Sequence, residues 1–142
     1  MDLALLVHVG STWAVVGVIW IIQLLVYPAM ASVPTEAFPA YERVHQRRVS
    51  WVLVLFAPAE VITGLIVFLA PGDIPRWMPF VGGVILVLLW VSTAFFFAPL
   101  HGRLLDGFDP GLHQRLVSSN WLRTVGWSAR GVLVLAMIAA GI

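Results

Sequence analysis

The sequence predicts an all-α fold: one integral membrane domain over residues 1–142, built as a four-transmembrane-helix bundle that runs up-down-up-down. Hydrophobic residues make up 61% of the chain and charged residues only 11%, whereas about a quarter of the residues of a soluble domain are charged. This composition argues against a soluble enzyme, a nucleic-acid binder and a disordered regulator. The chain has no cysteine, which excludes disulfides, cysteine zinc sites and cysteine nucleophiles.

Four apolar stretches are long enough to cross a bilayer core, which takes about 20 residues of helix. We expect the spans at roughly 7–27, 49–69, 78–98 and 122–142. The first lacks a basic segment before it and is too long for the apolar core of a signal peptide, so we interpret it as a retained helix. The second span carries Glu60 as its only charge, and the fourth carries Arg123 and Arg130.

The arginines between the spans predict the orientation, because cytoplasmic loops are enriched in basic residues. The loops after the first and third spans are rich in arginine, whereas the loop after the second contains only Arg76. We therefore expect loops 1 and 3 in the cytoplasm, both termini outside, and the chain in the cell (inner) membrane. The arginines of loops 1 and 3 are Arg43, Arg47, Arg48, Arg103 and Arg115.

The two halves of the chain show a weak internal sequence repeat. Trp20 lies shortly before Pro28 in the first span, and Trp90 lies shortly before Pro99 in the third. After the first span Phe38 leads to His45-Gln46-Arg47, and after the third Phe108 leads to His113-Gln114-Arg115. The pattern indicates a two-helix unit used twice; a chance match of short motifs is the alternative.

Glu60 and Arg130 both fall near the predicted bilayer midplane, eleven and eight residues into their spans. A central arginine costs about 2.5–3.5 kcal/mol on insertion scales, so it needs a partner inside the bundle. Glu60 is the only acidic residue at this depth, and the sequence therefore predicts a Glu60–Arg130 ion pair. The pair is either a packing device without chemistry or part of a site in which Glu60 moves a proton and Arg130 holds an oxygen.

Other polar residues follow helical faces and indicate a polar interior weighted toward the cytoplasmic half of the bundle. The alternative for this interior is interhelical hydrogen bonding without function. The alternative for Arg123 is snorkelling of its side chain to the membrane interface, and the alternative for Asn120 is helix capping. Deep tryptophans are the candidate walls of a pocket. The candidate catalytic residues are Glu60, His45, Tyr27 and Arg130, and the candidate ligand-binding residues are Gln23, Asn120, Arg123, Trp127, Trp20 and Trp90.

The four histidines do not form a metal-binding pattern. His8 lies near the outer side and the other three on the cytoplasmic side, which argues against a bis-histidine haem. No His-x-x-His or Glu-x-x-His pair occurs, and a site shared by His45, His101 and Glu60 has no support from spacing. We expect neither metal nor cofactor, and we interpret His113 as a solvated loop residue.

Three segments resemble a known family. They are Tyr27-Pro28-Ala29-Met30, Ala98-Pro99-Leu100-His101-Gly102-Arg103-Leu104 and Asn120-Trp121-Leu122-Arg123. The chain resembles small four-helix bacterial membrane proteins similar to the anthrone-oxygenase-like family, in which an asparagine stands where this chain has His101. The resemblance implies cofactor-independent oxygenation of an electron-rich aromatic, with Asn120 and Arg123 as the family-like positions.

The leading expectation is a membrane protein with one polar cavity inside the bundle. It would bind or transform a hydrophobic small molecule, such as an aromatic polyketide, a quinone or an isoprenoid, by oxygenase- or isomerase-like proton chemistry. Tyr27, His45 or Glu60 would move a proton, and Arg130, Arg123 and Asn120 would stabilise an oxyanion. The alternatives are a non-catalytic accessory subunit or assembly factor of a membrane complex, and a small oligomeric proton-linked transporter. Expected partners are the lipid bilayer, the small molecule and either further copies or a larger complex, but no nucleic acid.

Overall fold

A computed structural model describes residues 3–141, and within this range the chain forms helices and no strand. Two of the elements are single π-helical turns, in which the backbone widens for one turn. The elements are α1 (Leu3–Ile21), π-turn η1 (Ile22–Val26), α2 (Tyr27–Met30), α3 (Phe38–Leu69), α4 (Trp77–Ser92), π-turn η2 (Thr93–Phe97), α5 (Ala98–Leu104) and α6 (Pro110–Ala140).

These elements join into four helices that are long and apolar enough to cross a membrane, at Leu3–Met30, Phe38–Leu69, Trp77–Leu104 and Pro110–Ala140. The predicted all-α four-helix bundle is confirmed, and the chain has the architecture of an integral membrane protein. One side of the last span is exposed, since Leu122, Val125 and Val132 are 73%, 61% and 64% exposed.

The helices are longer than the predicted spans, and two of them begin much earlier. We expected the second span from residue 49 and the fourth from 122, but α3 begins at Phe38 and α6 at Pro110. The apolar criterion finds the stretch that fits in hydrocarbon, whereas the helix continues into polar residues beyond it. The predicted end of the fourth span at residue 142 lies outside the described residues.

The start of α6 also corrects the interpretation of two polar residues. The Asp109 side chain caps the helix by accepting a hydrogen bond from the Leu112 amide at 2.8 Å, and Pro110 follows as the first helical residue. Asn120 therefore lies within the helix and does not cap it. His113 also lies on the helix, where its Nε2 is 2.7 Å from the Tyr27 carbonyl oxygen, so it is not a solvated loop residue.

The first and third spans are interrupted in the same way. In each, a π-helical turn directly precedes the segment Tyr27-Pro28 or Ala98-Pro99, and the residue before proline bonds five residues back, to Ile22 or Thr93. Proline has no amide hydrogen and its ring crowds the preceding turn, which the wider π-turn accommodates. The π-helical turn before proline in both spans agrees with the weak internal repeat of the sequence.

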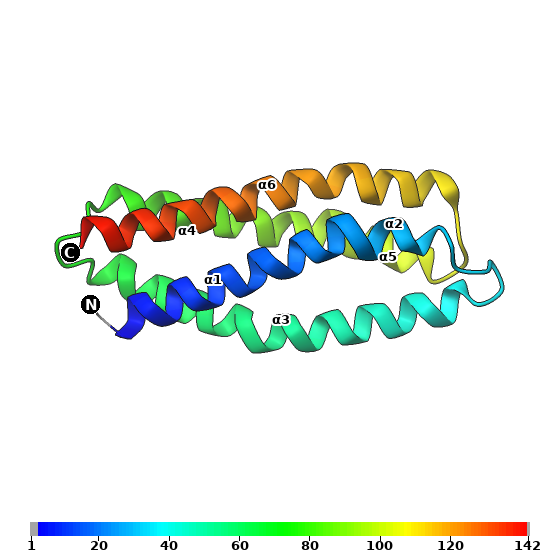
Figure 1. Cartoon of the computed structure of the whole chain (residues 1–142), viewed down its shortest axis with the longest axis horizontal. Helices are drawn as coiled ribbons and strands as arrows, with labels where there is room; N and C mark the ends of the chain where they lie inside the picture. Colours follow the sequence, from blue (N-terminus) through cyan, green and yellow to red (C-terminus); the bar gives the residue numbers. More distant parts are fainter. Residues whose placement is uncertain (1–2, 142) are drawn as a thin grey trace.

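The four spans alternate in direction and form an elongated bundle (Figure 1). The neighbours of α1 are α3 and α6, and these two are also the neighbours of α4. Figure 1 shows both ends of the chain at one end of the bundle and the segments that join α2 to α3 and α5 to α6 at the other. The termini thus share one side, as predicted; which side of the membrane this is stays a prediction from the arginines.

Close helix packing depends on a small residue where α6 meets α4. A Cβ added at Gly126 would lie 2.9 Å from Leu89 Cδ2, whereas one added at Gly17 would meet nothing within 4 Å. Small residues let membrane helices approach closely.

Gly126→Val should therefore destabilise the bundle by about 1–3 kcal/mol through overpacking against Leu89. Gly17→Val is the matched control and should leave stability unchanged apart from helix propensity. Unfolding of the purified protein in detergent measures both. Equal unfolding curves for the two variants would contradict close packing of α6 against α4.

Candidate functional site

The ion pair at the centre of the bundle joins α3 to α6. Arg130 Nε donates a hydrogen bond to Glu60 Oε1 at 2.9 Å, and both side chains are almost fully buried, 1% and 0% exposed. The Thr12 hydroxyl of α1 donates to the same carboxylate oxygen at 2.8 Å. The predicted Glu60–Arg130 pair is thus confirmed as a contact.

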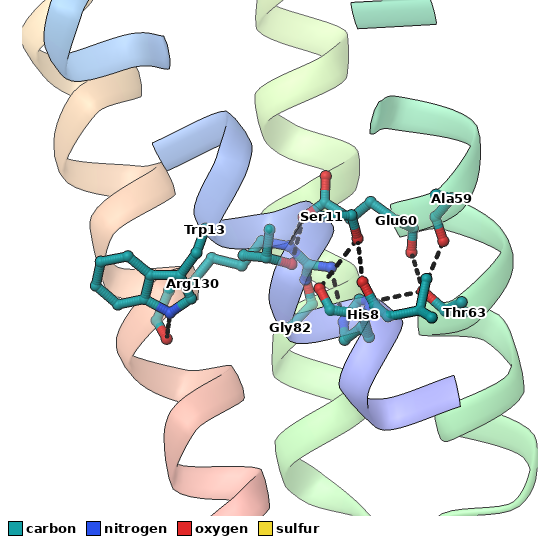
Figure 2. Close-up of polar contacts among 11 residues, drawn as sticks. His8, Ser11, Trp13, Ala59, Glu60, Thr63, Gly82 and Arg130 are labelled. Carbon is teal, nitrogen blue, oxygen red and sulfur yellow. Dashed lines mark hydrogen bonds and ion pairs between the residues drawn. The ribbon is translucent and has the colours of Figure 1, made fainter. Parts of the chain in front are cut away.

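The remaining nitrogens of the Arg130 guanidinium bind the other two helices (Figure 2). Nη1 donates to the carbonyl oxygen of Gly82 on α4, and Nη2 lies 3.2 Å from His8 Nε2 on α1. Because arginine only donates, His8 Nε2 is the acceptor and the imidazole is neutral. Its Nδ1–H then donates to the Thr63 hydroxyl at 3.2 Å, and Thr63 donates in turn to the Ala59 carbonyl at 2.6 Å.

A second polar group links η1 to α6 closer to the α2 and α5 end. Asn120 Nδ2 donates to Gln23 Oε1 at 2.8 Å, and Gln23 Nε2 donates to the Val117 carbonyl at 3.2 Å. Thr124 also lies within reach of Gln23 Oε1, at 3.4 Å. These amides satisfy each other, as in the interhelical hydrogen bonding that the sequence left open as an alternative.

A third group of hydrogen-bonded side chains, Glu42, His101 and Tyr27, lies at the α2 and α5 end and is called the relay below. The Tyr27 hydroxyl lies 2.9 Å from His101 Nε2, and His101 Nδ1 lies 2.6 Å from Glu42 Oε1. Gln46 donates to Glu42 Oε1 at 2.9 Å and to the His101 carbonyl at 3.1 Å. Glu42 is 0% exposed and Tyr27 2%. A carboxylate, an imidazole and a phenol are thus connected in series from α3 through α5 to α2.

The relay borders a cavity of about 160 Å³ between α3 and the η2–α5 segment. Tyr27, His101 and Arg123 line it together with His45, whose ring stacks on that of His101 with centroids 5.7 Å apart. Ser50 and Ala98, which are both exposed, also line it, so the cavity reaches the outer surface of the bundle.

Arg123 turns toward this cavity. Its guanidinium lies over the Phe97 ring at 4.5 Å, and its Nη1 donates to Asn120 Oδ1 at 3.3 Å. Its Nε–H is buried without a hydrogen-bond partner; Glu42 Oε2 and Glu60 Oε2 are also unpaired, but neither glutamate lines this cavity. Most buried polar atoms in proteins are paired, so unpaired ones at a cavity indicate a place where a bound molecule can complete the bonding.

The structure separates the residues that the sequence placed in one cavity. Glu60 and Arg130 belong to the central network, whereas Tyr27, His45 and Arg123 lie at the cavity near α2 and α5. Gln23 and Asn120 bind each other between these two groups. The expectation that His45 and Glu60 share one cavity is therefore wrong: both lie on α3, but they are separated by about 22 Å of helix.

The deep tryptophans form only part of a pocket wall. Trp127 is buried and meets Trp90 edge-on at 6.5 Å, and Trp90 lines a groove between α3 and α4. Trp20 is 38% exposed and donates to Ser128 at 3.0 Å. Neither Trp20 nor Trp127 lines the cavity beside the relay.

Sequence reasoning missed Glu42, and it considered His101 only as a metal ligand. The missed signal is Pro39, because proline is favoured in the first turn of a helix and here lies at the start of α3. A helix beginning there places Glu42 and Gln46 one turn apart on one face. Among the described residues, no group of three His, Cys, Asp or Glu side chains is arranged to hold a metal.

Arg130→Gln should destabilise the protein by about 3–5 kcal/mol, because it leaves the Glu60 carboxylate buried without its cation. The double variant Glu60→Gln/Arg130→Gln should recover part of this loss. Arg48→Gln, which changes an exposed arginine of α3, is the control and should have little effect. Thermal unfolding in detergent checks all three, and a double variant no more stable than Arg130→Gln would contradict the pairing argument.

The exchange Glu60→Arg/Arg130→Glu should be less stable than the wild type even though it restores opposite charges. The exchanged arginine would start from α3, away from the Gly82 carbonyl and His8 that Arg130 now binds. Full recovery of stability would show that these two further contacts contribute little.

No family model, no curated protein and no solved structure matches this chain. The function is therefore argued from the geometry of the relay and its cavity.

Proposed function

We propose that this chain binds a hydrophobic small molecule with an acidic hydroxyl or an enolisable carbonyl, and moves a proton on it. The observation that carries the proposal is the Glu42–His101–Tyr27 relay on a cavity that reaches the lipid-facing surface. A carboxylate that orients an imidazole, which in turn activates a hydroxyl, is a recurring arrangement for proton transfer.

The relay has a definite resting state. Glu42 only accepts, so the His101 proton lies on Nδ1 and points at Glu42 Oε1. His101 Nε2 is then an acceptor, and the Tyr27 hydroxyl donates to it. The Tyr27 oxygen also accepts from Arg123, and its remaining lone pair is available to a molecule in the cavity.

Proton transfer follows from this arrangement. The Tyr27 oxygen takes a proton from the bound molecule as its own proton passes to His101 Nε2. The bound molecule becomes an enolate or phenolate, and His101 becomes an imidazolium that faces the Glu42 carboxylate. Return of the proton to a different atom of the bound molecule gives a tautomer, and nothing is oxidised or reduced. The aromatic oxygenation implied by the family resemblance would begin with the same abstraction.

Arg123 supports the anion. It lines the cavity and interacts electrostatically with the Tyr27 phenol, and its Nε–H has no partner within the chain. A fixed cation beside developing negative charge is usually the largest contribution to stabilising such a transition state. Of the candidate residues, Tyr27, His45 and Arg123 thus belong to the proposed site.

Glu60 and Arg130 are better suited to holding the bundle together. Each charge already faces its partner, and the guanidinium bonds to α1, α3 and α4 at once. A proton taken up by Glu60 would break the ion pair and leave a buried arginine uncompensated, which is costly.

The experiment is hydrogen–deuterium exchange at the α-carbon of β-tetralone, an apolar enolisable ketone, in D₂O-containing micelles. The wild type should accelerate exchange over protein-free micelles. Tyr27→Phe should lower the protein-dependent rate by about 10²–10⁴-fold, the usual contribution of a general acid–base group. Nuclear magnetic resonance of the recovered ketone measures the deuterium content.

Tyr41→Phe is the matched control, because Tyr41 stacks near His45 at 6.4 Å but belongs neither to the relay nor to the cavity lining. It should exchange the ketone at the wild-type rate. If Tyr27→Phe and Tyr41→Phe behaved alike, or if the wild type gave only the micelle rate, proton transfer at this site would be refuted.

A further inference from the structure

The cavity beside the relay continues into a groove along the seam between α3 and α4. A groove of about 640 Å³ shares Ser50 and Leu53 with it, and a cavity of about 480 Å³ shares Val61 with that groove. The three hollows therefore adjoin one another in series. From Ser50 to Val61 alone the α3 axis rises about 16 Å.

The seam exists because α3 packs closely on α1 but only loosely on α4. Only 17% of the apolar window of the span that contains α3 is buried, compared with 44% for the first span. Pro58 interrupts the hydrogen bonding within α3 and lines the groove. A helix with a proline and little buried surface leaves room beside it.

The residues that line the seam change from polar at the relay to apolar in the middle. The end at the relay carries Tyr27, His45 and Arg123, whereas the middle is formed almost entirely by apolar side chains of α3. Trp90 also lines the middle, and its Nε1–H is buried without a partner.

The far end of the seam is closed by the central network. His8 and Arg130 line the third cavity, but both are 2% or less exposed and bond to each other. The other side chains around this cavity are mostly apolar, among them Leu65, Phe68 and Val87.

The volume of the cavity beside the relay limits the size of the molecule that it can hold. A cavity of about 160 Å³ is smaller than the roughly 300–1,000 Å³ of sites that enclose a drug-sized ligand. It has room for a compact polar head, and the rest of a larger molecule has to leave through the groove that adjoins it.

We infer that the ligand is a single-tailed amphiphile, with a compact planar acidic head at Tyr27, His45 and Arg123 and a long apolar tail along the α3–α4 seam. This inference rests on the proposed function, because it assumes the head at the relay. The tail lies against apolar side chains, so the molecule enters sideways from the bilayer. The Trp90 Nε1–H offers a hydrogen bond to an oxygen on the tail.

The test uses para-nitrophenol and its ortho-hexyl and ortho-dodecyl derivatives, whose absorbance reports binding and ionisation. Each is titrated into the detergent-solubilised protein and into protein-free micelles, so that partitioning is subtracted. Arg123→Gln should weaken all three probes at least tenfold. Arg103→Gln, which changes an exposed arginine of α5, should weaken none.

Ala57→Trp and Val61→Phe obstruct the seam, since both residues line it, whereas Leu55 on the same helix is 67% exposed and absent from the lining. Both obstructing variants should weaken the dodecyl probe at least tenfold and leave para-nitrophenol unchanged. Leu55→Trp is the matched control and should change neither. Unfolding midpoints establish that each variant is folded.

The outcomes separate the two proposals. If para-nitrophenol binds through Arg123 but the obstructing variants bind the dodecyl probe as Leu55→Trp does, the seam is ordinary lipid-facing surface and the tail assignment is overturned. If no probe binds beyond partitioning, the head site fails and the proposed function fails with it.

Discussion

The guanidinium of Arg130 touches all of the other three spans, and the arrangement of the bundle depends on this contact. From α6 it bonds to Glu60 on α3, to the Gly82 carbonyl on α4 and to His8 on α1. In an apolar interior each unpaired polar group is costly, so helices that shift or rotate away from this arrangement lose several bonds at once. Without these bonds, the packing of apolar side chains would define the relative depths of the helices in the membrane far less well.

The polar interior divides into a central network, which joins all four spans, and a relay, which borders a cavity. Each contains a buried carboxylate oxygen without a partner, Glu60 Oε2 and Glu42 Oε2. In the central network the donors and acceptors of Arg130, His8 and Thr63 largely satisfy one another. At the α2 and α5 end, Arg123 lines a cavity and its Nε is unpaired. Stability therefore resides mainly in the first group, and the second group offers an unpaired donor at a cavity to the proposed ligand.

The repeated breaks in the first and third spans bring the relay together. Tyr27 directly follows the π-turn η1, and His101 lies one turn beyond η2. Each half of the chain thus supplies one member of the Tyr27–His101 contact, just as the halves supply Glu60 and Arg130 to the central pair. The two residues of this contact thus lie near corresponding prolines of the two halves, as in a two-helix unit used twice.

The sequence by itself determined the four spans, their alternation and the ion pair, because length, apolar composition and a single acidic residue at membrane depth leave few alternatives. It did not determine the helix starts or the Glu42–His101–Tyr27 relay, although Pro39 and the Asp109-Pro110 cap were present as signals. Glu42 and His101 are 59 residues apart in the chain, and their meeting depends on how α3 and α5 are rotated. In spans that are apolar on nearly every side the hydrophobic pattern carries little information about rotation. Only the tertiary packing of side chains and buried polar contacts decided which faces meet.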